Sequence, residues 1–304
     1  MASRTKIEWT QGEDGSAGQT WNVVTGCDRI SPGCDHCYAL TMAKRLKGMG
    51  SAKYQTDGDP RTSGPGFGLT IHPDVLTDPL RWKKPRKVFV NSMSDLFHAR
   101  VPREFLARVF AVMAATPQHT YQILTKRPER AARILTDLCT CGTGHPPGEH
   151  FRAQMEWAAT SHSPTYVPGL EHGIYHRSGW PLPNVWIGTT IESDDYTRRL
   201  DALRKTPAAI RFVSAEPLLG PLPTADFTDI DWVIIGGESG AGARPFDPAW
   251  ATDLIVQARE HGAAPFVKQL GSVWARTNNA SDTKGGKPDD WPAQLRVREY
   301  PGGA

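Results

Sequence analysis

The sequence predicts an α/β protein whose core is a full or partial (β/α) barrel carrying a Cys/His-rich insertion. Two observations predict this class. Short β-branched and aromatic runs alternate with helix-like segments along most of the chain, which indicates βαβ units and a parallel sheet. About seven such runs, as counted below, suit a barrel better than the alternative, a doubly wound open sheet. We expect one barrel-like domain over residues 1–304.

The first half of the chain shows three strand and three helix patterns. The strands are predicted from β-branched and aromatic residues at 21–27, 88–92 and 120–125. The helices are predicted at 38–46, 102–116 and 128–138. The second of these begins at Pro102 and carries an apolar stripe through Phe105, Val109, Val112 and Met113.

The second half continues the alternation. Strands are predicted at 185–191, 210–216, 231–237 and 265–271, and helices at 193–206 and 247–260. Ser193 and Asp194 are suitable caps for the first of these helices. Residues 48–80 form a long loop rich in Gly, Pro, Asp and Thr, and residues 275–304 form a polar tail. Residues 139–183 are too long for an ordinary connection and are interpreted as an insertion.

The composition excludes several classes of protein. Hydrophobic residues make up 39% and charged residues 22%, so a largely disordered chain is not expected. No run of 18 apolar residues predicts a membrane span, and the N-terminus lacks the apolar core of a secretory signal. We therefore expect a cytoplasmic, reducing setting, in which the 5 cysteines are ligands or nucleophiles. A net charge of +3 permits a nucleic-acid partner without requiring one.

Three cysteines, Cys27, Cys34 and Cys37, follow the first predicted strand with C-x₆-C-x₂-C spacing. Neighbouring Gly and Pro residues let the loop bend, so three thiolates can converge. Three thiolates can hold a [4Fe–4S] cluster and leave one iron open to S-adenosylmethionine, whose cleavage gives a 5′-deoxyadenosyl radical. The alternatives are a zinc site completed by His36, or buried cysteines without a ligand.

Long stretches of the sequence resemble a phage gene-product family of unknown function, found in phages and bacteria, which is itself similar to radical-SAM enzymes. The stretches are KIEWTQ, TWNVVTGCDRISPGCDHCYA, VFVNSMSDLFH, ILTKRP, VWIGTTIES, RFVSAEPLLGP, WVIIGGESGAGARP and FVKQLG. The resemblance implies a (β/α) barrel of the radical-SAM type and an iron–sulfur cluster, but it implies no substrate. The commonest radical-SAM spacing is C-x₃-C-x₂-C, so the first gap here is three residues longer.

Polar groups end the predicted strands, where (β/α) barrels place their chemistry. The expected S-adenosylmethionine-binding residues are Asn91, Ser92, Asp95, Thr190, Glu192, Glu216, Gly236, Gly237 and Glu238. Their carboxylates can accept hydrogen bonds from the amino group or the ribose, and the glycines allow close backbone approach. The basic and amide groups that can join them are Lys126, Arg127, Arg244, Lys268 and Gln269.

The Gly236-Gly237-Glu238 triplet resembles a radical-SAM motif that holds the methionyl amino group. That motif usually follows the second strand, whereas the triplet here follows the sixth predicted strand. Asn91, Ser92 and Asp95 occupy the position after the second predicted strand. We therefore do not assign the binding of the methionyl amino group to Glu238 alone.

The insertion contains a second Cys/His group, formed by Cys139, Cys141, His145 and His150. Two cysteines and two histidines within twelve residues are compatible with a Cys₂His₂ zinc site. The C-x-C gap is tighter than in typical zinc fingers. An exposed, loosely ordered loop is the alternative.

The leading functional prediction is a radical-SAM enzyme that receives electrons from an external donor. The runner-up is a non-catalytic zinc-binding module that binds nucleic acid or a protein, and a phage structural component is disfavoured. A nucleic acid or a modified base is a reasonable substrate, because a basic run surrounds Trp82. Its basic residues are Arg81, Lys83, Lys84, Arg86 and Lys87, with Arg198 and Arg199 further along. A solvated basic loop is the alternative, and no membrane partner is expected.

Overall fold

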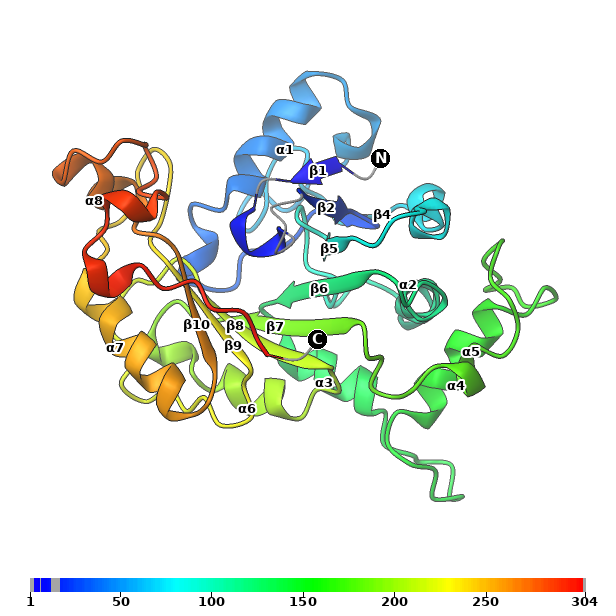
Figure 1. Cartoon of the computed structure of the whole chain (residues 1–304). Helices are drawn as coiled ribbons and strands as arrows, with labels where there is room; N and C mark the ends of the chain where they lie inside the picture. Colours follow the sequence, from blue (N-terminus) through cyan, green and yellow to red (C-terminus); the bar gives the residue numbers. More distant parts are fainter. Residues whose placement is uncertain (1–2, 6, 12–16, 303–304) are drawn as a thin grey trace. The chain divides into compact units, whose positions relative to one another are not determined.

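The computed structural model describes residues 3–5, 7–11 and 17–302 and shows a mixed α/β fold (Figure 1). Within these residues there are eight α-helices and an eight-stranded sheet in the order β1-β2-β5-β6-β7-β8-β9-β10. This order is linear, with β1 and β10 at its two ends, so the described strands correspond to a partial rather than a closed barrel. The α/β class predicted from the alternating pattern is confirmed.

Residue contacts divide the chain into two compact units. The first unit comprises Met1–Ile30, Tyr38–Ile187 and Lys205–Ala209. The second unit comprises Ser31–Cys37, Gly188–Arg204 and Ile210–Ala304. The boundary passes through the segment that carries Cys27, Cys34 and Cys37, which we call the cysteine loop. Cys27 belongs to the first unit, and Cys34 and Cys37 belong to the second.

The strands of the first unit pair mainly in parallel. β2 pairs with β5 and β5 with β6 in parallel, while β1 is antiparallel to β2. β3 and β4 form a separate antiparallel pair. The bounds are β1 Ser3–Thr5, β2 Gly18–Trp21, β3 Val24–Thr25, β4 Thr70–Ile71, β5 Lys87–Val90 and β6 Thr120–Thr125. β7, Val185–Thr190, begins in this unit and ends in the second.

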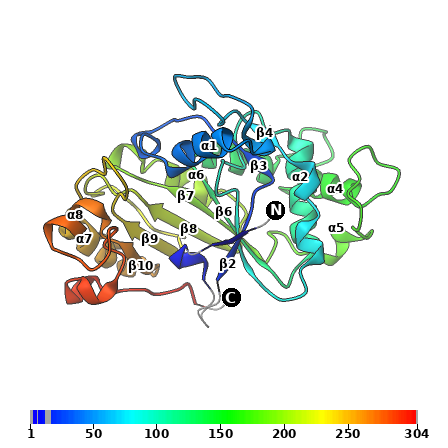
Figure 2. The ribbon, with the colours of Figure 1, turned by 90° about the horizontal axis from the view of Figure 1, so that it is seen from above.

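Helices α2 and α4 of the first unit lie side by side (Figure 2), and aromatic side chains meet between them. Phe110 of α2 meets Phe151 of α4 edge to face at 5.4 Å between ring centroids, and Trp180 lies 6.0 Å from Phe151. The predicted insertion, residues 139–183, therefore contains two helices, α4 and α5, with an apolar anchor of its own. The helices are α1 Tyr38–Gly48, α2 Arg103–Ala115, α3 Pro128–Thr136, α4 Glu149–Ala158 and α5 Ile174–Arg177, with short 3₁₀ helices at Glu8–Thr10, Ala52–Tyr54, Pro73–Val75 and Asp78–Arg81.

The second unit is built on three parallel strands that follow β7. β8 pairs with β9 and β9 with β10, and Trp232 of β9 packs against Phe212 and Phe266 from the flanking strands. The strands are β8 Ile210–Ala215, β9 Trp232–Gly236 and β10 Ala264–Gln269. The helices are α6 Arg199–Arg204, α7 Pro248–Glu260 and α8 Gly271–Thr277, with 3₁₀ helices at Pro32–Cys34, Asp194–Tyr196, Pro288–Asp290 and Ala293–Leu295.

Three local features differ from the sequence prediction. The strand expected at 21–27 is interrupted after Trp21, because β2 ends there and β3 pairs with β4 instead. The helix expected at 193–206 is split into a 3₁₀ turn and the short α6. The polar tail is anchored, since Trp291 is buried and donates from Nε1 to the Gly285 carbonyl at 2.9 Å.

None of the helices formed by the described residues is both long and apolar enough to cross a membrane. This finding agrees with the absence of an 18-residue apolar run in the sequence.

Replacing Gly188 with Ala should destabilise the second unit. A Cβ at this position would collide with the ring of Phe212, which is fully buried. Overpacking of this kind costs about 1–3 kcal/mol in unfolding free energy. The matched control is Gly220→Ala, because a Cβ at Gly220 meets no atom within 4 Å. Denaturant unfolding of both variants checks this, and equal midpoints for the two would contradict it.

Candidate metal centres

In the first unit, Cys27 lies two residues after β3 and beside the partly exposed guanidinium of Arg127. Arg127, which follows β6, donates from Nη1 to Cys27 Sγ at 3.5 Å and to Asp95 Oδ2 at 2.8 Å. Its Nη2 donates to the Asp28 carbonyl at 3.2 Å. The thiolate is the form of cysteine that binds metals, and a neighbouring cation favours it. Arg127 therefore places a positive charge beside the Cys27 sulfur.

Asp95 is buried, and both of its carboxylate oxygens are used inside the protein. Oδ1 accepts hydrogen bonds from the Phe97 amide at 2.9 Å and the Thr125 hydroxyl at 2.7 Å. Oδ2 accepts from the Lys126 amide at 3.1 Å and from Arg127. Sequence reasoning placed Asp95 in the cofactor pocket. The contacts show that it holds the end of β6 and orients the guanidinium that touches Cys27.

A second carboxylate next to Cys27 was missed by sequence reasoning. Asp28 accepts hydrogen bonds from the Thr62 hydroxyl at 2.8 Å and pairs with His98 Nε2 at 2.9 Å. Burial raises the pKa of Asp28, but its hydrogen bonds with Thr62 and His98 lower the pKa overall. His98 is buried, and that burial lowers the pKa of its imidazole. The sequence offered one signal for this pair. His98 follows Asp95 by three residues at the polar end of the SMSDLFH segment.

Asn91 directly follows β5 and has a left-handed backbone with φ of +61°, which asparagine tolerates better than most residues. Its Oδ1 accepts a hydrogen bond from the Val24 amide at 3.1 Å. Its Nδ2 is buried and has no hydrogen-bond partner within the described part of the chain. Ser92 donates from its hydroxyl to Asn22 Oδ1 at 3.2 Å. A buried donor without a partner is costly, so Asn91 Nδ2 is suited to a polar ligand.

In the second unit, Cys34 ends a 3₁₀ turn and Cys37 follows it closely. The Cys37 amide donates to the Cys34 carbonyl at 3.2 Å, and the Ser31 hydroxyl lies 3.8 Å from Cys34 Sγ. Both cysteines are partly exposed, as is Cys27.

Glu192, which follows β7, is completely buried and holds this turn. Its Oε1 accepts from the Gly33 amide at 3.3 Å, and its Oε2 accepts from Arg199 Nη1 at 2.9 Å. The same nitrogen donates to the Thr190 carbonyl at 2.8 Å. A Cβ on Gly33 would lie 3.2 Å from the Glu192 carboxyl. A side chain at position 33 would therefore crowd Glu192.

Glu238, which follows β9, holds the same turn from a second strand end. It pairs with Arg244 at 2.6 Å and with His36 Nδ1 at 3.1 Å, and Arg244 also donates to the Pro32 carbonyl at 3.0 Å. Burial raises the pKa of Glu238, but the hydrogen bonds from Arg244 and His36 outweigh it and lower the pKa to about 2.

Glu216 follows β8 and pairs with Lys268 of β10 at 3.0 Å. A Cβ on Gly236 would lie 2.5 Å from Glu216 Oε1, and a Cβ on Gly237 would lie 2.5 Å from the Leu270 carbonyl. From the sequence, we expected the two glycines to let a ligand approach the backbone closely. Their neighbours show that they permit close packing around Glu216 and β10.

The structure thus brings the predicted residues into two separate groups. One, in the first unit, joins Cys27, Asp95 and Arg127. The other, in the second unit, joins the turn that carries Cys34 to Glu192 and Glu238. Most of the carboxylates that we expected to contact a ligand pair with groups of the protein itself. Through these contacts they hold the cysteine loop.

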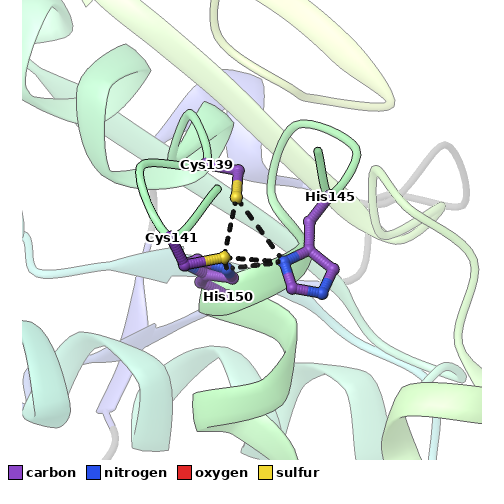
Figure 3. Close-up of side chains that lie close together, drawn as sticks. All are labelled: Cys139, Cys141, His145 and His150. Carbon is purple, nitrogen blue, oxygen red and sulfur yellow. Dashed lines mark hydrogen bonds between the residues drawn. The ribbon is translucent and has the colours of Figure 1, made fainter. Parts of the chain in front are cut away.

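The second Cys/His group converges in space, as Figure 3 shows. The ligand atoms of Cys139, Cys141, His145 and His150 all lie within 4.8 Å of one another, so the group can hold a metal ion. Hydrogen bonds from the Cys141 side chain and backbone, with smaller contributions from His145, lower the pKa of Cys139 to about 5. The four residues that the sequence grouped together therefore meet in space, and they lie in an exposed loop.

The basic run before β5 is partly engaged within the protein. Arg81 forms an ion pair with Asp78. Arg86 lies over the Trp82 ring at 5.0 Å, and His119 meets the same ring at 5.4 Å. Trp82 is therefore packed against protein groups, whereas Lys83 and Lys84 are exposed.

Glu238→Gln should lower the stability of the protein at neutral pH by about 1.5–3 kcal/mol, because charge-assisted hydrogen bonds to Arg244 and His36 are weakened. The folded-state pKa of about 2 lies below the ordinary value of 4.5. The stabilisation is therefore present above pH 4.5 and is lost as pH falls through 2. Unfolding free energies measured between pH 7 and pH 2 should converge for the two proteins. A constant difference across this range would contradict the assignment.

Comparison with known families identifies the chain. No curated protein and no solved structure matches it. A family model described as "Protein of unknown function (DUF5131)" matches residues 4–293, which include all the cysteines and strand ends described above. The chain belongs to the DUF5131 family.

Proposed function

We propose that this protein is an iron–sulfur protein of the radical-SAM type, in which Cys27, Cys34 and Cys37 hold a [4Fe–4S] cluster. The observation on which the proposal rests is that side chains at the strand ends hold the cysteine loop in place. In each unit, charged side chains that follow parallel strands contact the loop directly: Arg127 meets Cys27, and Glu192 meets Gly33. Chemistry in parallel α/β folds is concentrated at these strand ends.

The donor set suits such a cluster. All three cysteines are partly exposed, and thiolates are the usual ligands of iron–sulfur clusters. Three thiolates leave one iron without a protein ligand. The zinc alternative needs a fourth ligand, and His36, whose Nδ1 lies 3.1 Å from Glu238, would have to supply it through Nε2.

Asn91 is the residue best suited to contact S-adenosylmethionine. Its Nδ2 is a buried donor without a partner in the described chain, and its neighbour Ser92 is polar. Such a donor matches the carboxylate of the cofactor. When bound, the cluster and S-adenosylmethionine would supply one-electron cleavage of the sulfonium and thus radical chemistry.

The strand-end carboxylates then act as positioning residues. Asp95 holds Arg127 against Cys27, while Glu192 and Glu238 hold the turn before Cys37. Thr190 contributes its carbonyl to the same support through Arg199. Glu216 stays a candidate for cofactor contact, because it is partly exposed next to Gly236.

A nucleic acid or a modified base is the proposed substrate class, and an external donor supplies the electron. The exposed Lys83 and Lys84 support phosphate contacts. Trp82 does not support base stacking, because Arg86 and His119 already cover it. The runner-up, a zinc-binding module that binds nucleic acid or protein without catalysis, predicts zinc in place of iron in the cysteine loop.

Replacing Cys27 with Ala should sharply reduce bound iron and abolish formation of 5′-deoxyadenosine, since one of three thiolate ligands is lost. The measurement is iron content and product after anaerobic reconstitution, with S-adenosylmethionine and a reductant. Cys139→Ala is the control and should keep both. Zinc in the parent protein without iron would favour the runner-up, and equal iron in the parent and a Cys27/Cys34/Cys37 triple variant would refute the cluster.

Asn91→Asp should weaken binding of S-adenosylmethionine by about tenfold or more, because loss of a hydrogen bond to a charged group costs about 1.5–3 kcal/mol. The substitution keeps the shape and the Oδ1 acceptor that meets Val24, but it removes the Nδ2 donor. Equilibrium binding to the reconstituted protein measures the effect. Asn278→Asp, at an exposed asparagine, is the matched control. Unchanged affinity in a folded Asn91→Asp variant would exclude this contact.

A further inference from the structure

We propose that Cys139, Cys141, His145 and His150 form a structural Zn²⁺ site that closes the connection between α3 and α4. The four ligand atoms come from one short stretch of chain and converge on one point, as Figure 3 shows. This site shares no residue with the cysteine loop, and it does not depend on the function proposed above.

The distances between the ligand atoms approach those of a tetrahedral zinc site, and all of them lie within 4.8 Å. The sulfurs of Cys139 and Cys141 are 3.0 Å apart, and His145 Nδ1 lies 3.5 Å from the first and 3.3 Å from the second. His150 Nε2 lies 3.6 Å from Cys141 Sγ and 3.0 Å from His145 Nδ1. Zinc bonds of about 2.3 Å to sulfur and 2.0–2.1 Å to nitrogen place tetrahedral ligands roughly 3.3–3.8 Å apart. Shifts of less than about 1 Å therefore admit the ion.

The residue types favour zinc over other metals and favour a structural role. Two thiolates and two imidazoles are a standard closed set for Zn²⁺, whereas catalytic zinc sites keep one position for water. Calcium and magnesium require oxygen ligands instead. The Thr143 hydroxyl lies 2.8 Å from both Cys141 Sγ and His145 Nδ1, but hydroxyl groups are not usual zinc ligands.

The site is tied to well-packed elements on both sides. α3 ends at Thr136, and Asp137, which follows it, forms an ion pair with Arg103 of α2. The Gly148 amide donates to the Thr136 carbonyl, which brings the two ends of the connection together. His150 lies in the first turn of α4. The loop between these anchors is exposed and lacks an apolar core of its own, so an ion is the available means of ordering it.

The ion should order this connection without being required for the packing of α4. The aromatic contact between Phe110 and Phe151 holds α4 on α2 independently of the four ligands. Removal of zinc is therefore expected to increase hydrogen exchange in residues 137–150 and to leave α2 protected.

The test measures zinc in the full-length protein, produced with a histidine-free affinity tag and purified under reducing conditions. About one zinc per chain is expected in the parent. It should also be present in Thr143→Ala, in His162→Ala and in the Cys27/Cys34/Cys37 triple alanine variant. The Cys139→Ser/Cys141→Ser double variant and His150→Ala should retain almost none. Co²⁺ added to the chelator-treated parent should give the visible spectrum of a tetrahedral thiolate site.

Three results would overturn the proposal. One is equal zinc in the parent and a soluble Cys139→Ser/Cys141→Ser variant. Another is zinc that disappears in the Cys27/Cys34/Cys37 variant but persists in the double variant, which would place the ion in the cysteine loop. The third is a Cys139–Cys141 disulfide in the reduced preparation, with no zinc and no Co²⁺ spectrum. Because iron and zinc are measured separately, failure of this site and failure of the radical-SAM proposal are distinguishable.

Discussion

The buried carboxylates after the parallel strands are the groups on which the rest of the candidate site depends. A carboxylate removed from water is costly unless it is paired and hydrogen-bonded. Glu192 is fully buried and meets this requirement with Arg199 and the Gly33 amide, and Asp95 meets it with Arg127 and the end of β6. The cysteine loop therefore supplies one of the hydrogen bonds that Glu192 needs, through the Gly33 amide, while Asp95 orients the guanidinium that contacts Cys27.

The alternating pattern of the sequence was enough to predict the parallel strands and most of the helices. The run 120–125 coincides with β6, and the helix predicted at 102–116 differs from α2 by one residue at each end. Such segments have strong local patterns and are buried on the expected face. The strand predicted at 21–27 failed because its second half pairs with β4, which lies more than forty residues away and has no local signal.

The partners of the polar strand ends could not be predicted from the sequence. Residue types indicated that Asp95, Arg127, Glu192 and Glu238 would be important, and they lie at strand ends as expected. Whether a carboxylate faces a ligand or an internal cation depends on contacts between residues far apart in the chain. Glu238 meets His36, for example, 202 positions away. The Cys/His group of the insertion was predictable because its four ligands lie within twelve residues, so chain geometry alone brings them close.

The two cysteine groups differ in surroundings, and this difference supports different chemistry for each. Cys27 lies beside a guanidinium that is held by a buried carboxylate, so its electrostatic environment is set by the folded core. Charges and hydrogen bonds near sulfur are the means by which proteins tune a redox centre. Cys139 and Cys141 lie in an exposed loop with two imidazoles, and their hydrogen-bond partners come from the same short stretch of chain. The zinc that we propose for the second group would close a loop, whereas the cluster that we propose for the first would be tuned by charges that the folded core holds in place.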